Sequence, residues 1–279
     1  MPTTRLEGAR ADMNYLTTQE IRNELIEVLT SFDEFCRIHE LRYSLYAGTL
    51  LGAVRHGGFI PWDDDLDVCM PRPDYMELLS LAASIPNGYG LVLPESDGYS
   101  CPFCKYVNLG IAAQEPISAG VYEGRLWMDI FPVDGAPSRE NERQKNQEKF
   151  CRMQMLSDWS FYGAAEEDGK IKGMVKNLGC VLLDEKRAKR HMMSYLERLS
   201  ITPGYDKATY VTSYAAGLTK SWALPKGDYE SSVLLEFEGR QFPAMSCWDA
   251  GLRQWYGDYM VLPPESARVT HSYKAWRID

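Results

Sequence analysis

An aspartate-rich segment constrains the fold of this chain more than any other feature. Residues 63–67 read DDDLD, and Asp65 and Asp67 alternate with the apolar Leu66 and Val68. This alternation predicts a strand from which both carboxylates leave on the same face. Adjacent carboxylates repel each other, and hard divalent cations that prefer oxygen ligands relieve the repulsion. The segment therefore predicts a metal site, and two such cations can hold the attacking and leaving oxygens of a phosphoryl transfer.

An acidic run is also typical of a solvated turn. Asp63 and Asp64 follow Pro61 and Trp62, and they are equally consistent with residues that only shape such a turn. For the pair that follows them a functional setting is favoured, because large apolar residues frame it and a glycine-containing turn precedes it.

A third acid lies in the apolar run LWMDIF at 126–131, which predicts a buried strand. Asp129 stands there between Met128 and Ile130. Burial of a lone carboxylate is costly, so Asp129 either lies at an exposed strand end or faces a cation. The cation is favoured, because two other carboxylates already require one.

Composition excludes several classes of function. The chain has 279 residues, 45% of them hydrophobic, which suffices for one large domain or two smaller ones. Its net charge of -9 argues against nucleic acid as the main partner, because phosphate backbones require basic surface. The start MPTTRLEGARADMNY has no apolar signal region, and no apolar run approaches the roughly 18 residues that span a bilayer. We therefore expect a soluble, cytoplasmic protein without a transmembrane segment.

Cysteine usage supports the same compartment. The seven cysteines are an odd number and are scattered, which is typical of reduced thiols. Cys101 and Cys104 form a lone CxxC that suits half of a zinc site, a redox pair or a structural role. A structural role is favoured, because no second cysteine or histidine pair accompanies it.

The periodicity of apolar residues outlines the elements. Thr17 and Glu20 predict the capped start of a packing helix that ends near His39. The other expected elements are strands at 43–47, 66–70, 91–93, 103–109, 126–131, 209–213 and 233–238, and helices at 50–56, 74–84, 138–162, 170–200 and 248–255.

Between the first strand and the second helix, Gly48 and Thr49 predict a turn. The amides of such a turn and of the helix N-terminus can hold a phosphate. Arg55 and His56 lie about two helical turns further on, where they can reach that phosphate, or His56 can simply cap the helix. Lys105 is either another phosphate contact or a solvated lysine.

The order of these features resembles the nucleotidyltransferase fold of the polymerase-beta type. Residues 48–72, GTLLGAVRHGGFIPWDDDLDVCMPR, closely resemble the signature of the LicD family, which is related to the fukutin group. WMDIFPVDG at 127–135 and WYGDYMVLPPESARVTH at 255–271 resemble two further blocks of that family. The resemblance implies an α+β fold in which helices flank a mixed sheet. It also implies one catalytic domain over 1–279, with a core at about 17–135, a helical insertion at about 138–205 and the rest of the core at 206–279.

The same resemblance implies a phosphotransferase that moves phosphocholine from CDP-choline, or a similar group from another CDP-activated donor. The acceptor would be a hydroxyl of a cell-surface glycan or a teichoic acid precursor. Asp65 and Asp67 would hold Mg²⁺ or Mn²⁺, and Asp129 would be either the third ligand or the base. Arg268 and His271 would contact the acceptor or the leaving phosphate, unless they are a surface arginine and a partly buried histidine.

Two other functions share these motifs. A nucleotidyltransferase that moves NMP to a sugar or small molecule would use the same acids, and a non-catalytic nucleotide- or glycan-binding protein would keep the fold. Under the phosphotransferase reading we expect the protein at the inner face of the membrane, in peripheral contact with a lipid-linked acceptor.

Overall fold

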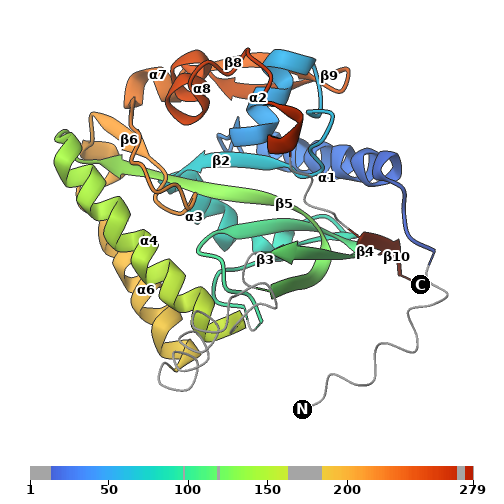
Figure 1. Cartoon of the computed structure of the whole chain (residues 1–279), viewed down its shortest axis with the longest axis horizontal. Coiled ribbons are helices and arrows are strands. Elements are labelled where there is room, and N and C mark those ends of the chain that lie inside the picture. The colour runs from blue at the N-terminus through green and yellow to red at the C-terminus, as the bar shows by residue number, and fades with distance from the viewer. Residues whose placement is uncertain (1–13, 97, 118–119, 163–183, 269–273, 279) are drawn as a thin grey trace.

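The computed structural model describes residues 14–96, 98–117, 120–162, 184–268 and 274–278, and they form the α+β fold predicted from the sequence (Figure 1). Within these residues an eight-stranded mixed sheet has the order β1-β2-β5-β4-β10, with β3 added to β4 and with β6 and β7 added to β5. Its strands are β1 Ser44–Leu45, β2 Asp67–Pro71, β3 Tyr89–Val92, β4 Cys104–Ile117, β5 Gly120–Ala136, β6 Tyr210–Thr212, β7 Leu224–Pro225 and β10 Lys274–Arg277.

The helices and a separate hairpin surround this sheet. In Figure 1, α4 and α6 run alongside each other at one side of the sheet, while α2, α8 and the β8–β9 hairpin lie together at its top. The helices are α1 Thr18–Ile38, α2 Ala47–His56, α3 Arg72–Ser80, α4 Glu140–Tyr162, α6 Glu185–Ser200, α7 Lys226–Glu230 and α8 Trp248–Tyr256, and the hairpin consists of β8 Ser232–Phe237 and β9 Arg240–Met245. Within the described ranges, no helix is both long enough and apolar enough to cross a bilayer.

Helix α1 follows directly from its sequence. The Thr17 hydroxyl accepts the Glu20 amide and the Glu20 carboxylate accepts the Thr17 amide, so the predicted capping box is present. The buried side chains of α1 recur at helical spacing and pack against the sheet. Phe32, for example, meets the rings of Tyr43 and Tyr106 with centroids 5.1 and 5.4 Å away. The helix ends at Ile38, close to the predicted boundary.

The register between neighbouring strands determines where the acidic side chains lie. β2 and β5 are parallel neighbours, and Asp67 pairs in register with Asp129. The Asp129 amide donates to the Leu66 carbonyl at 2.9 Å, so pairing extends one residue before β2. On the other side of β5, antiparallel β4 sets Lys105 opposite Asp129. Long-range pairing thus brings together side chains that are far apart in the chain.

Several predicted boundaries differ from the structure. The predicted turn at Gly48–Thr49 is wrong, because α2 already begins at Ala47. The predicted helix at 74–84 begins earlier, at Arg72, and ends at Ser80, followed by a 3-10 turn at Ala82–Ser84. Strands β4 and β5 extend well beyond the predicted strands, and the part of the 170–200 helix before residue 184 lies outside the described residues.

The C-terminal segments return to the same sheet. β6 pairs with the end of β5, and β10 pairs with β4. The β8–β9 hairpin packs on α2, where Glu238 accepts the Phe59 amide at 2.9 Å. An added Cβ at Gly58 would lie 2.2 Å from that carboxylate, so a larger residue there would displace the Glu238 side chain. The hairpin therefore fixes the end of α2 and the segment that leads to the aspartates.

Candidate active site

Asp67 stands at the start of β2 with its backbone held on two sides. Its amide donates to the Thr49 hydroxyl at 2.8 Å, and its carbonyl accepts the Tyr46 amide at 3.0 Å. Thr49 is buried, so its hydroxyl joins α2 to β2. Because α2 and the start of β2 meet here, the backbone of Asp67 is held in place beside Asp129 in the middle of β5.

Asp65 lies just before β2, so it leaves an extended segment rather than the strand itself. Desolvation, and after it the negative charges of Asp67, Asp63 and Asp129, raise the pKa of the Asp65 carboxyl well above its usual range. The structure thus brings the three predicted acids together, with Asp63 as a fourth. Such crowding of carboxylates is relieved by a bound cation or a proton.

Lys105 is the basic member of this group. Its Nζ lies 2.5 Å from Asp129 Oδ1, and the side chain is almost fully buried. The ring of Trp127 lies 4.3 Å from the ammonium, and those of Phe103 and Tyr99 lie 5.7 and 6.0 Å away. The alternative of a solvated lysine is therefore wrong, because an ion pair and three aromatic faces hold the ammonium inside the protein.

The N-terminus of α2 opens beside the acids. Tyr46 precedes the helix in an extended conformation and gives it no side-chain cap, while Ala47 has φ 43°. A positive φ on a residue with a Cβ is strained and is held only by its surroundings. An added Cβ at Gly48 would lie 2.7 Å from Asp63 Oδ2, so the helix start and the acidic segment meet closely. Uncapped helix amides are suited to a phosphate.

A cavity of about 350 Å³ lies at the same place, and its lining includes Gly48, Asp63, Arg55 and Trp62. Two guanidinium groups lie near the Trp62 ring, Arg55 at 6.0 Å from its centroid and Arg268 at 4.8 Å. Cations beside a helix N-terminus create a positive potential that favours an anionic ligand. The structure thus brings together Arg55 and Arg268, which are more than two hundred residues apart in the chain.

The two histidines predicted to contact the substrate are His56 and His271. His56 is exposed at the last turn of α2, with its ring 6.4 Å from that of Trp62. Gly57, at φ 68°, ends the helix through its own amide. His271 lies outside the described residues. A role for either histidine stays a prediction.

The charge pattern fits a divalent cation, since four carboxylates crowd one place and raise a pKa there. Among the described residues, however, there is no ready-made group of three or more His, Cys, Asp or Glu side chains with metal-site geometry. The ion pair with Lys105 directs one oxygen of Asp129 towards the ammonium. The acids thus have the right chemistry for Mg²⁺ or Mn²⁺ without forming a rigid cage.

Sequence reasoning missed Arg22, which it assigned to a packing helix. The Arg22 guanidinium donates to the carbonyls of Asp63 at 2.7 Å, Pro61 at 2.9 Å and Ile60 at 3.0 Å. It therefore holds the backbone of the turn that carries the acids. No local pattern could reveal this, because the acceptors are backbone atoms about forty residues away.

Arg22→Ala is expected to lower kcat/KM about tenfold, because the acidic turn loses its support and small displacements in a site are costly. Arg22→Lys should recover little of the loss, since one ammonium cannot replace a planar guanidinium on three carbonyls. Steady-state kinetics on both variants, with the exposed Arg37→Ala on the same helix as control, check this. Full activity of Arg22→Ala would show that the turn holds without it.

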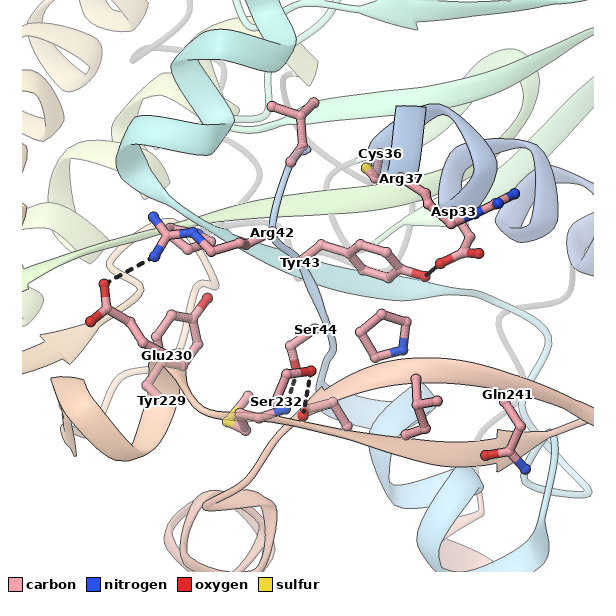
Figure 2. Close-up of a pocket in the computed structure, with 16 residues that line it drawn as sticks. Asp33, Cys36, Arg37, Arg42, Tyr43, Ser44, Tyr229, Glu230, Ser232 and Gln241 are labelled. Atoms are coloured by element: carbon pink, nitrogen blue, oxygen red, sulfur yellow. Dashed lines mark hydrogen bonds and ion pairs between the residues drawn. The ribbon is translucent and has the colours of Figure 1, made fainter. Parts of the chain in front are cut away.

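A further cavity, of about 360 Å³, lies at the other end of β1 and β2 (Figure 2). Figure 2 shows Arg42 and Glu230 on one side, Tyr43 bonded to Asp33 on the other, and the hairpin below. Its lining contains Ser44 and Pro71, whereas the acids lie beyond the opposite ends of these strands. This cavity is separate from the candidate site.

Within the described part of the chain, the CxxC cysteines do not belong to any group of three or more side chains that could hold a metal ion. Cys101 and Cys104 are free thiols, and the Cys104 amide donates to the Tyr75 hydroxyl at 2.9 Å. Burial raises the pKa of Cys101 to about 11 and that of Cys104 to about 12, so both remain protonated thiols at neutral pH.

Comparison with known proteins agrees with this geometry. A model described as LicD/FKTN/FKRP, nucleotidyltransferase domain, matches residues 40–100, which contain α2, the acidic turn and β2. The chain is 29% identical over 271 residues to the lipopolysaccharide cholinephosphotransferase LicD of Haemophilus influenzae, covering 93% of this chain and 97% of that protein. It is also 36% identical over 74 residues to an uncharacterized protein of Rickettsia prowazekii, covering 26% of this chain and 24% of that protein.

Together the fold and the matched domain define a class, that of proteins with a nucleotidyltransferase-like domain. Within that class the chain is similar to the LicD family, both in the matched domain at residues 40–100 and in its likeness to one member over nearly its whole length.

Proposed function

We propose that this enzyme transfers phosphocholine from CDP-choline to a hydroxyl of lipopolysaccharide or of a related cell-surface glycan such as a teichoic acid precursor. The observation that carries the proposal is the meeting of Asp65, Asp67 and Asp129 beside an uncapped helix N-terminus. The similarity to a lipopolysaccharide cholinephosphotransferase over nearly its whole length supports the transferred group and the acceptor.

The acids have separate tasks in this proposal. Asp65 and Asp67 would hold Mg²⁺ or Mn²⁺, which when bound neutralises negative charge on the donor pyrophosphate. Asp129 would accept the proton of the attacking sugar hydroxyl or act as a third ligand. Lys105 keeps one oxygen of Asp129 in a fixed direction through its 2.5 Å contact.

The donor would lie across the α2 N-terminus. The first amides of the helix, at Ala47 and Gly48, would contact a phosphate, and Arg55 and Arg268 would neutralise the leaving CMP from either side of Trp62. In this arrangement the acceptor hydroxyl attacks the phosphorus that carries choline, the bond between that phosphorus and the CMP oxygen breaks, and the proton goes to the base. Positioning and charge neutralisation supply most of the acceleration.

The test is to incubate the enzyme with Mg²⁺, CDP-choline and a lipopolysaccharide acceptor. The proposal predicts CMP release that depends on the acceptor, together with choline phosphate on the glycan, detected by mass spectrometry. Release of pyrophosphate from CTP in the presence of a sugar would instead identify a nucleotidyltransferase. Neither product, together with tight nucleotide binding, would identify a non-catalytic binding protein.

Arg55→Ala is expected to raise the KM for the donor about tenfold and to change kcat less, because it removes a contact with the donor rather than with the attacked phosphorus. Arg253→Ala is a matched control, since it removes the same charge from an exposed position on α8. Initial rates at varied CDP-choline concentration separate the two effects. An unchanged donor KM would remove Arg55 from the site.

A further inference from the structure

A short loop after α8 exposes three consecutive apolar side chains. Met260 is 57% exposed, Val261 65% and Leu262 49%. Exposed apolar residues usually occur singly, and a contiguous exposed run marks a surface that meets something apolar. The run lies in the block between Tyr256 and Pro263, directly beside the candidate site.

This exposure belongs to a fixed loop. Tyr259 is buried, and its hydroxyl donates to Asp249 at 2.6 Å. Its carbonyl accepts from Arg55 at 2.6 Å, and the Pro263 carbonyl accepts from Arg268 at 3.1 Å. The loop is therefore held at both ends by the two arginines of the site, while the side chains between these ends point away from the core.

The loop also forms one edge of the site cavity. Val261, Pro263 and Tyr259 line the same space as Arg55 and Trp62. Whatever the exposed run contacts therefore lies next to the candidate site. An apolar surface in this position is suited to contact the lipid that surrounds a lipid-linked acceptor.

We propose that Met260, Val261 and Leu262 enter the interface of the phospholipid bilayer in which a lipid-linked acceptor lies. This inference rests on the proposed function, because a glycan attached to a lipid requires the enzyme to work at a membrane surface. Arg55 and Arg268 provide local positive charge beside the apolar run, as expected of an interfacial contact. The carboxylates of Asp258 and Glu265 lie on the same segment and oppose that charge, so insertion of the apolar side chains carries the contact.

The net charge of the chain argues against a membrane contact that is driven by charge. At -9, the protein as a whole is repelled by anionic lipid. Adsorption over a broad basic face therefore does not compete with the loop. Binding should consequently persist at high salt, whereas adsorption driven by charge would vanish.

The test uses the whole protein and vesicles of phosphatidylethanolamine and phosphatidylglycerol without acceptor. Cosedimentation should show binding that Met260→Ser/Leu262→Ser weakens at least tenfold; Val261 is left unchanged because it lines the cavity. The control is Ile201→Ser/Leu234→Ser, which removes two apolar side chains that are 68% and 63% exposed elsewhere. Absence of binding by the unaltered protein, or equal loss in both variants, would overturn the proposal.

A second experiment distinguishes a failure of this inference from a failure of the proposed function. Met260→Ser/Leu262→Ser should keep its kcat/KM on a water-soluble, delipidated oligosaccharide and lose at least tenfold on the same glycan embedded in vesicles. Equal loss on both acceptors would make the loop part of the active site and would overturn the membrane contact. Failure of the unaltered enzyme on every acceptor would overturn the proposed function, while the vesicle-binding result would still decide the role of the loop.

Discussion

Asp67→Asn is expected to lower kcat by about a thousandfold, because the loss of one charged ligand removes transition-state stabilisation of several kcal/mol. Asparagine keeps the shape of aspartate, and the backbone of residue 67 stays bonded to Thr49 and Tyr46. The substitution therefore changes the charge and little else. Because it removes one carboxylate from a crowded cluster, the melting temperature should stay the same or rise.

Kinetics and thermal unfolding of the same samples check both parts of this prediction. Asp65→Asn should behave in the same way. Asp228→Asn, which removes a carboxylate from an exposed position on α7, should keep full activity. Activity within tenfold of the unaltered enzyme in Asp67→Asn would exclude this carboxylate from the metal pair. A clear loss of melting temperature would mean that the cluster is structural.

Asp134→Ala is expected to lower the free energy of unfolding by about 3–5 kcal/mol, because it leaves a largely buried guanidinium without its counter-charge. Asp134 is fully buried, and it accepts bonds of 2.6 and 2.9 Å from Arg72. This pair joins the start of α3 to the end of β5, on the strand that carries Asp129.

Urea unfolding measures this loss. Glu27→Ala is the matched control, because its ion pair with Arg240 is exposed and such pairs contribute less than about 1 kcal/mol. Arg72→Leu/Asp134→Leu should be more stable than Asp134→Ala, since it leaves neither charge buried. A loss below about 1 kcal/mol in Asp134→Ala would show that water compensates Arg72.

Local patterns predicted the elements well where the deciding contacts are local. The capping box of α1 needs only Thr17 and Glu20, and both act as predicted. The acidic alternation after Trp62 and the apolar run around Asp129 each predicted a strand, and β2 and β5 are those strands. That these two strands are neighbours, and that the acids therefore meet, was implied only by the family resemblance.

The errors came from contacts between distant segments. The Gly48–Thr49 pair suggested a turn, yet the positive φ falls on Ala47, and Gly48 lies inside α2 with the Asp63 carboxylate close by. The sequence left Lys105 open between a phosphate contact and a solvated lysine, because its partner is fixed only by the register of β4 on β5. Arg22 gave no signal, since its acceptors are carbonyls of another segment. Backbone acceptors and cross-strand register are properties of the folded chain.

We propose above all that Asp65 and Asp67, beside Asp129, hold a divalent cation against the donor pyrophosphate. Titration of Mn²⁺ followed by electron paramagnetic resonance, with and without CDP-choline, tests it most directly. We expect saturable binding that CDP-choline tightens and that Asp65→Asn and Asp67→Asn each weaken at least tenfold. Equal Mn²⁺ affinity in the unaltered protein and both variants would contradict it.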